Sequence, residues 1–400
     1  MSIKIDENKI NEILTRSIDT IYPDKETFKK MLFSGKQLRI YMGIDPTATY
    51  IHLGHATNYI VLQRLHELGH KIIVLIGDFT AMIGDPSDKT AARKHLTKDE
   101  VQKNLKGFKE QISKILDFKD KKNPIEFRFN SEWLSKLNFG EIINLASHFT
   151  VQRMLERDIF EKRIKERKPL YVHEFFYPLM QGYDSVALNA DVEIGGTDQT
   201  FNMLAGRALV KDYQDKEKIV MTTTLLENPI TGEKLMSKSL GTGIALNESI
   251  NNMFGKVMAL PDEAIIQMFT DCTYLSTEEI KKMENELKVG FNPKDLKMIL
   301  AYEIVKMYYS EKDAEKAKEY FISVFQKKDL PDEIPEFKLA EMNIVDVLFE
   351  TKLAESKGDA KRLIKQGAIE VNGKKITSIN EVVEKGSVIQ KGKRFFAKIV

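Results

Sequence analysis

The chain has 400 residues, of which 42% are hydrophobic and 30% charged, and this composition is typical of a globular protein with two or three domains. Its 61 Lys and Arg nearly balance 59 Asp and Glu, which excludes an acidic tail protein, a disordered chain of high net charge and a uniformly basic histone-like protein. The N-terminus is polar and no apolar run approaches the roughly 18 residues of a membrane span, so we expect a cytoplasmic protein that does not bind a membrane.

Short apolar runs alternate with longer helical patterns from Arg39 to about Val220, within a domain predicted at 1–225. The runs at 39–43, 72–77 and 125–129 lack the alternation of a half-exposed strand, which indicates strands buried on both faces of a parallel sheet. This part of the chain is therefore predicted to be an α/β core of the nucleotide-binding type. We expect a helical insertion at about 131–170.

Well-marked helix starts follow Leu246. They are a capping box at Ser276 and Glu279, an N-cap and a Pro at Asn292 and Pro293, and a further capping pattern from Ser310 to Asp313. We predict a loop and an all-helical domain over 226–326. A charged segment with two prolines, 327–338, is predicted to be a linker.

A small basic domain is predicted at 339–400. Residues 351–400 hold 12 Lys and Arg against 5 Asp and Glu, so this segment carries +7 while the rest of the chain carries −5. A helix at 345–353 and strands at 369–371, 388–390 and 397–400 make it an α+β domain. RNA-binding candidates are Lys361, Arg362 and Lys365, of which the first and the last share a helix face.

The first motif with clear chemistry lies between a predicted strand and a predicted helix. His52 and His55 stand on one face of the first helical turn, where unpaired backbone N–H groups and the helix dipole favour an anion such as phosphate. Gly54 leaves room for a nucleotide base to lie close to the backbone. Two surface histidines in a loop are the structural alternative.

The second motif is a loop of lysines and serines at 233–241, flanked by glycines. Ammonium and hydroxyl groups on such a loop can close on a triphosphate and neutralise the charge that grows as pyrophosphate leaves. Taken alone, the loop is equally well interpreted as a solvated turn.

Tyr177, Gln181 and Asp184 are separated by four and three residues, so they line one helical stripe. A polar helix face is the alternative for the stripe alone. Further along, Asp198 follows a glycine pair after a predicted strand, an arrangement that suits a ribose hydroxyl.

Together these motifs resemble those of the tyrosyl-tRNA synthetases, a family within the class I aminoacyl-tRNA synthetases. The resemblance covers about 40–238, and the basic tail resembles a small RNA-binding domain shared with a ribosomal small-subunit protein. It rests on the two motifs above and on four blocks in the family's order and spacing: Tyr41-x-Gly43-x-Asp45-Pro46-Thr47-Ala48, Gly84-Asp85-Pro86-Ser87-x-Lys89, Tyr177-x-x-x-Gln181-x-x-Asp184 and Gly195-Gly196-Thr197-Asp198-Gln199.

The resemblance implies a Rossmann-like core in a bacterial-type homodimer. It implies that ATP, with Mg²⁺, and L-tyrosine give tyrosyl-adenylate and pyrophosphate, and that tyrosine then passes to the 3′-terminal adenosine of tRNA(Tyr). Adenylation needs no protein nucleophile, because the carboxylate of the amino acid attacks the α-phosphate. The protein supplies positioning and electrostatic stabilisation.

Site residues are carried over by the same resemblance, in three sets. The catalytic set comprises Thr47, His52, His55, Lys89, Arg93 and Lys238. The tyrosine-binding set comprises Tyr41, Asp45, Asp85, Tyr177, Gln181, Asp184 and Gln199. The ATP-binding set comprises Asp45, His52, Gly54, His55, Asn58, Gly196, Asp198 and Lys238.

Within the tyrosine-binding set, Tyr41 and Asp184 are implied to meet the phenolic hydroxyl of the substrate. The chain departs from the family pattern at Leu235, which stands at the first position of the Lys-Met-Ser-Lys-Ser signature while Lys234 is displaced by one. Asn58 occupies a position that is threonine in some members.

Three alternative functions remain open. A tryptophanyl-tRNA synthetase is disfavoured by Tyr41 and Asp184, since an indole has no hydroxyl for this pair to bind. A small-molecule nucleotidyltransferase shares the His-x-Gly-His device, but the Lys/Ser loop, the helical domain and the basic tail argue against it. The retained motif residues argue against an RNA-binding protein without activity.

The single cysteine, Cys272, and seven histidines without a Cys-x-x-Cys pair offer no strong zinc spacing, so no structural zinc is expected. Residues 133–165, mixed apolar and basic, are the predicted dimer interface, with a solvated helical insertion as the alternative.

Overall fold

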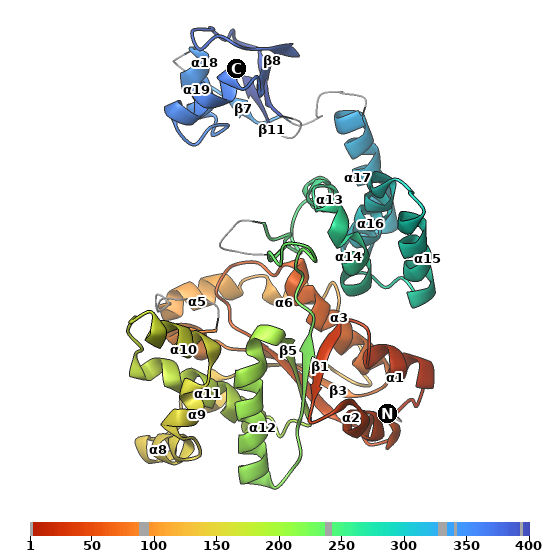
Figure 1. Ribbon diagram of the computed structural model, residues 1–400, viewed down its shortest axis with the longest axis vertical. Coiled ribbons are helices and arrows are strands. Elements are labelled where there is room, and N and C mark those ends of the chain that lie inside the picture. Colours follow the sequence, from red (N-terminus) through yellow and green to blue (C-terminus); the bar gives the residue numbers. More distant parts are fainter. Residues whose placement is uncertain (1–2, 88–95, 237–241, 327–333, 340–341, 393–394) are drawn as a thin grey trace. The chain divides into compact units, whose positions relative to one another are not determined.

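The computed structural model describes residues 3–87, 96–236, 242–326, 334–339, 342–392 and 395–400 (Figure 1). It divides into two compact units, Met1–Ala317 and Lys318–Val400. Among the described residues, no helix combines the length and the apolar character that a membrane crossing requires.

A six-stranded sheet forms the centre of the first unit. Its strand order is β1-β6-β5-β2-β3-β4, in which every neighbouring pair is parallel except β1 with β6. The predicted parallel α/β core is therefore confirmed. The strands span Ile18–Tyr22 (β1), Arg39–Ile44 (β2), Lys71–Ile76 (β3), Glu126–Phe129 (β4), Val192–Gly196 (β5) and Ile219–Thr223 (β6).

The strand order reverses between β2 and β5. From β2 the chain moves to β3 and β4 on one side, and it later returns to build β5 and β6 on the other. Such a reversal leaves a crevice at the carboxyl ends of the two central strands, where open α/β sheets bind ligands. The helices of this part are α1 (Glu7–Ile13), α2 (Lys25–Phe33), α3 (Leu53–Glu67), α4 (Thr80–Ile83), α5 (Lys98–Leu105) and α6 (Phe108–Ile112).

Helices fill the connections on either side of β5: α7 to α11 lie between β4 and β5, and α12 lies between β5 and β6. The pair α11 and α12 packs closely because Gly182 and Gly206 face each other: a Cβ on Gly182 would lie 3.1 Å from the Gly206 nitrogen. The elements are α7 (Ser131–Leu134), α8 (Phe139–Ser147), α9 (Val151–Leu155), α10 (Asp158–Lys165), α11 (Val172–Ala187), a 3₁₀ turn (Thr197–Gln199) and α12 (Thr200–Gln214).

A run of helices follows the sheet. The predicted starts are confirmed, since Ser276 and Glu279 form a reciprocal capping box, Asn292 caps a helix with Pro293 at its first position, and Ser310 accepts from the Asp313 N–H. The helices are α13 (Ile250–Met258), α14 (Ile265–Cys272), α15 (Thr277–Lys288), α16 (Pro293–Tyr308) and α17 (Glu311–Phe321), with a 3₁₀ turn at Asp262–Ala264 and a π turn at Ile322–Gln326.

The second unit has a separate apolar core under a five-stranded sheet of order β7-β11-β10-β8-β9. The predicted helix at 345–353 ends three residues early, where Lys352 takes a positive φ of 58°. The elements are β7 (Glu336–Phe337), α18 (Ile344–Glu350), α19 (Lys357–Lys365), β8 (Ile369–Val371), β9 (Lys374–Lys375), β10 (Val388–Lys391) and β11 (Phe395–Ile399).

Candidate active site

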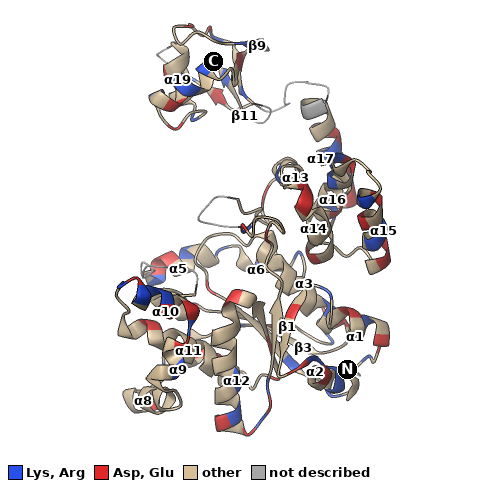
Figure 2. Ribbon diagram, in the orientation of Figure 1, with Lys and Arg blue, Asp and Glu red and all other residues tan. Residues whose placement is uncertain are grey.

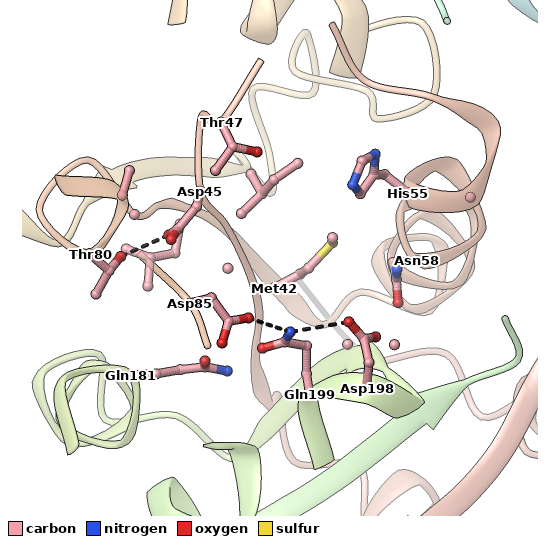
Figure 3. Close-up of a pocket in the computed structure, with 18 of the residues that line it drawn as sticks. Met42, Asp45, Thr47, His55, Asn58, Thr80, Asp85, Gln181, Asp198 and Gln199 are labelled. Carbon is pink, nitrogen blue, oxygen red and sulfur yellow. Dashed lines mark hydrogen bonds between the residues drawn. The ribbon is translucent and has the colours of Figure 1, made fainter. Parts of the chain in front are cut away.

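A pocket of about 910 Å³ lies at the carboxyl ends of β2 and β5, where the strand order reverses (Figure 3). Most of the predicted site residues line it, although they come from segments as far apart in the chain as Asp45 and Gln199. These are Asp45, Thr47, His52, Gly54, His55, Asn58, Asp85, Tyr177, Gln181, Asp184, Gly196, Asp198 and Gln199.

Other predicted residues are not among the described residues that line this pocket. Tyr41 is fully buried and is absent from the described lining. Three predicted cations fall outside the part of the chain that the structure describes: Lys89, Arg93 and Lys238. Three more basic residues belong to α19 in the second unit: Lys361, Arg362 and Lys365.

Asp45 follows β2 directly and is held by two hydroxyl groups. Thr80 Oγ1 donates to its Oδ1 at 2.8 Å, and the Tyr177 hydroxyl donates to its Oδ2 at 2.9 Å. Gly77 makes room for this carboxylate, because a Cβ there would lie 2.0 Å from Asp45 Oδ1. The carboxylate is therefore fixed in position between β2, the start of α4 and α11.

Asp85 is almost fully buried and accepts hydrogen bonds from several directions. Its Oδ1 accepts from the Ser87 N–H at 2.9 Å and from Arg157 at 3.3 Å, and its Oδ2 accepts from Gln199 Nε2 at 2.8 Å. The same Gln199 nitrogen lies 3.3 Å from Asp198 Oδ2, so one amide joins two acidic residues of the pocket (Figure 3).

The start of α3 brings the two histidines together. The His52 N–H donates to His55 Nδ1 at 3.3 Å, and their rings stack with centroids 3.8 Å apart. A Cβ on Gly54 would lie 3.1 Å from His52 Nδ1, so glycine keeps this turn tight. One turn on, Asn58 Oδ1 accepts from Thr223 Oγ1 at 2.9 Å.

The segments that flank residues 237–241 reach the same place. His52 forms a β-bridge with Ala245, and Lys234 and Met236 line the pocket. Leu235 is buried, whereas Lys234 is exposed at its edge. The displaced lysine is thus the one of these two residues that borders the pocket.

Asp184 lies at the inner end of the pocket. It accepts from Trp133 Nε1 at 2.7 Å and from Asn130 Nδ2 at 3.3 Å. Burial raises the pKa of Asp184 well above its usual range, while these two hydrogen bonds oppose the shift. Tyr41, predicted beside it, instead bonds Ser185 Oγ through its hydroxyl at 2.7 Å.

Sequence reasoning missed several residues that shape the site. Arg157 comes from the helical insertion and has no local signal, since only the fold brings it to Asp85. Glu193 lines the pocket from inside β5, and a charged residue in a buried central strand was a signal that could have been used. Thr80 and Gly77 line the pocket, where Thr80 donates to Asp45 and Gly77 leaves room for its carboxylate.

Comparisons with protein families place the chain in a class. Residues 34–326 match the model of the class I tRNA synthetases for tryptophan and tyrosine, and residues 326–398 match the C-terminal domain of tyrosine–tRNA ligases. The chain therefore belongs to the class I tRNA synthetases. Within that class, it belongs to the tyrosine–tRNA ligase family, as relatives over nearly its whole length show.

Two relatives carry this assignment. A tyrosine–tRNA ligase of Carboxydothermus hydrogenoformans is 47% identical over 97% of both chains. One from Thermotoga maritima is 45% identical over 97% of this chain and 96% of the relative.

Solved structures agree on the fold. A truncated mitochondrial tyrosyl-tRNA synthetase of Aspergillus nidulans has a TM-score of 0.67 at 23% identity and covers 80% of this chain and 95% of its own. The synthetase of Archaeoglobus fulgidus, solved with L-tyrosine, has a TM-score of 0.61 at 22% identity and covers 78% and 100%.

Proposed function

We propose that the chain joins L-tyrosine to ATP as tyrosyl-adenylate and then transfers tyrosine to tRNA(Tyr). The observation that carries this proposal is that one pocket, at the reversal of strand order, joins a helix start bearing His52 and His55 to Asp45 and Asp184. Membership of the tyrosine–tRNA ligase family supports the choice of tyrosine.

In the proposed reaction the carboxylate of tyrosine attacks the α-phosphate and pyrophosphate leaves. ATP enters as its Mg²⁺ complex, in which the metal is carried mainly by phosphates and water. Thr47, His52 and His55, with Lys89, Arg93 and Lys238, are proposed to balance the charge that builds on the phosphates. Gly54, Asn58, Gly196 and Asp198 are proposed to hold adenine and ribose.

The acidic residues of the pocket are proposed to bind the amino acid. Asp85 and Tyr177 offer a carboxylate and a hydroxyl oxygen to its α-ammonium group, and Gln181 adds an amide. Gln199, which donates to Asp85, is proposed to position the amino acid, and Asp45, which accepts from Tyr177, is proposed to lie between the amino acid and ATP. These groups are already held in place by one another, so little ordering is needed on binding.

At the other end of tyrosine, Asp184 is proposed to bind the phenolic hydroxyl, because it lines the pocket. Tyr41 is proposed to act on this end through Ser185, to which its hydroxyl is bonded. We also propose that Lys234 supplies the cation that Leu235 cannot, since Lys234 borders the pocket while Leu235 is buried.

We propose the domain functions that the sequence predicts. Residues 1–225 carry out catalysis, 226–326 contain the signature loop and the anticodon side, 327–338 form a linker and 339–400 bind RNA. The matches to two family models, which meet at residue 326, support the boundary there. Lys361, Arg362 and Lys365 are exposed on α19, where Figure 2 shows basic residues, and suit phosphates of tRNA.

We further propose a homodimer that works in the cytoplasm. Helices α8, α9 and the start of α11 present large apolar side chains to solvent, which is unusual for a monomer surface. The exposed fractions are 77% for Phe139, 56% for Ile143, 66% for Val151 and 74% for Val172. Gel filtration with light scattering tests this, and a Phe139→Glu variant should shift a dimer to monomer.

The proposed activity is tested by ATP–pyrophosphate exchange with tyrosine, tryptophan and phenylalanine in parallel. Exchange that depends on tyrosine, followed by charging of tRNA(Tyr), supports the proposal. Exchange that depends on tryptophan would favour the alternative synthetase, and exchange with none of the three would contradict amino-acid activation.

A further inference from the structure

A buried ion pair lies directly behind the amino-acid end of the pocket. Lys218 precedes β6 and Glu193 lies in β5, and their side chains are 0% and 2% exposed. The ammonium of Lys218 donates to Glu193 Oε2, to Ser185 Oγ at 2.6 Å and to the Met203 carbonyl at 3.2 Å. All three of its N–H donors are therefore matched by acceptors.

The backbone leaves room for this ammonium group at one glycine. A Cβ on Gly206 would lie 2.6 Å from Lys218 Nζ and 2.7 Å from Ser185 Oγ. Glycine inside a helix such as α12 is less favourable than alanine. The space that Gly206 leaves is thus used by a charge, which argues that the ion pair is a specific feature of the packing.

The pair is connected to the pocket through the second oxygen of the same carboxylate. Glu193 lines the pocket, and its Oε1 accepts from Gln181 Nε2 at 3.1 Å. An ionised carboxylate can only accept hydrogen bonds, so it selects the nitrogen end of the Gln181 amide. The oxygen end of that amide is then the end available to a ligand.

We propose that Lys218 is a positioning residue for the amino acid. It holds one oxygen of Glu193, so that the other fixes the Gln181 amide with its oxygen toward the α-ammonium group of the substrate. This inference rests on the proposed binding of an amino acid in the pocket. It adds a role for Glu193 and Lys218, neither of which touches the reacting atoms.

The first test is Glu193→Gln, which keeps the shape of the side chain. Lys218 still requires an oxygen, so the new amide turns its nitrogen toward Gln181 and forces that amide to reverse. The substrate ammonium then meets N–H donors. We expect the KM for tyrosine in pyrophosphate exchange to rise at least about tenfold, the effect of losing one charge-assisted hydrogen bond, with the KM for ATP nearly unchanged.

The second test is the double variant Lys218→Met with Glu193→Gln. Without the ammonium, the amide at position 193 can rotate and present its oxygen to Gln181 again. The KM for tyrosine should therefore return most of the way to that of the unaltered chain. Lys218→Met alone leaves a buried carboxylate without its cation, so this single variant should be less stable than the double variant.

A matched control is the buried pair Arg163 and Glu174, whose side chains are 1% and 4% exposed and do not line the pocket. Arg163→Met with Glu174→Gln should lower the melting temperature and leave the KM for tyrosine as it is. The inference is overturned if Glu193→Gln lowers only the melting temperature and leaves the KM for tyrosine unchanged. It is also overturned if the double variant has a higher KM for tyrosine than either single variant. If pyrophosphate exchange by the unaltered chain did not depend on tyrosine, the proposed function would be overturned, and this inference with it.

Discussion

At the scale of single residues, Asp184 has an environment that suits recognition of a hydroxyl group. Two N–H groups converge on its carboxylate, and burial excludes the water that would otherwise solvate it. A phenol supplies a further donor to such a group, whereas a phenyl ring leaves it without that partner. An unpaired buried acceptor costs about 1 to 3 kcal/mol, which is the source of the discrimination.

We therefore expect Asp184→Asn to reduce the preference for tyrosine over phenylalanine by at least about tenfold. The asparagine keeps the size of the side chain but replaces one acceptor oxygen of the carboxylate with an NH₂ donor. The ratio of kcat/KM values for the two amino acids in pyrophosphate exchange is the measurement. An unchanged ratio would remove Asp184 from the phenol-binding role.

Gly77 provides a second test at this scale. A methyl group there would lie 2.0 Å from Asp45 Oδ1, so Gly77→Ala must displace the carboxylate and break its bond with Thr80. We expect adenylate formation to slow by about 100-fold, as follows from a displacement of about 1 Å in a reacting site. Single-turnover kinetics measures it, and Gly255→Ala, where a methyl group meets nothing, is the control.

At the scale of elements, the parts of the site that were predictable are those that follow a strand or start a helix. Asp45 after β2, His52 before α3 and Asp198 after β5 carry local signals, because the chain itself sets their spacing. The stripe of Tyr177 and its neighbours on α11 follows the helical period. Arg157 could not be predicted, since its partner Asp85 lies 72 residues away and meets it only through the packing of the insertion.

Orientation within an element was also beyond the sequence. The pattern predicted β2 correctly, but it did not indicate which face of the strand Tyr41 occupies. The buried cation of Lys218, 5.8 Å from the Tyr41 ring, and the hydroxyl of Ser185 draw the tyrosine behind the pocket wall. Both come from elements far along the chain, so no local rule contains the information.

The turn between α3 and β3 holds a buried histidine that makes stability depend on pH. His70 Nδ1 accepts from the Leu38 N–H at 3.3 Å, and its Nε2 has no partner within the described residues. Burial lowers the pKa of His70 to about 4 from 6.5. The unfolded chain protonates His70 more readily than the folded chain does. The stability that neutral, buried His70 contributes is therefore complete above pH 6.5 and is lost as the pH falls toward 4.

We expect His70→Asn to make the unfolding free energy less dependent on pH in this window, by up to about 3 kcal/mol between pH 6.5 and 4. Asparagine can place an acceptor oxygen near the position of Nδ1 and cannot take up a proton. Urea unfolding of both chains at a series of pH values is the measurement. Parallel curves for the two chains would contradict the assignment.

At the scale of the whole molecule, the second unit differs from the first in net charge and has a separate apolar core. The second unit has its own apolar cluster around Ile344, Leu348 and Ile389. Its strand β7, Glu336–Phe337, pairs with β11, so a cut before Glu336 removes a complete sheet. The net charge of +7 in residues 351–400 leaves with it, while every described pocket residue stays behind.

We therefore expect deletion of residues 336–400 to leave tyrosine-dependent pyrophosphate exchange within about twofold and to weaken tRNA binding markedly. The lost affinity should be electrostatic, so the slope of log K against log salt should also fall, by about 1 for each phosphate contact removed. Lys361→Ala with Lys365→Ala should show part of the same change, and Lys121→Ala with Lys122→Ala, exposed between α6 and β4, should show none. Exchange, melting temperature and tRNA affinity at several salt concentrations separate these effects.

A truncated chain with unchanged tRNA affinity and salt slope would mean that this unit does not bind tRNA. Loss of exchange together with charging would mean that it supports the fold of the first unit.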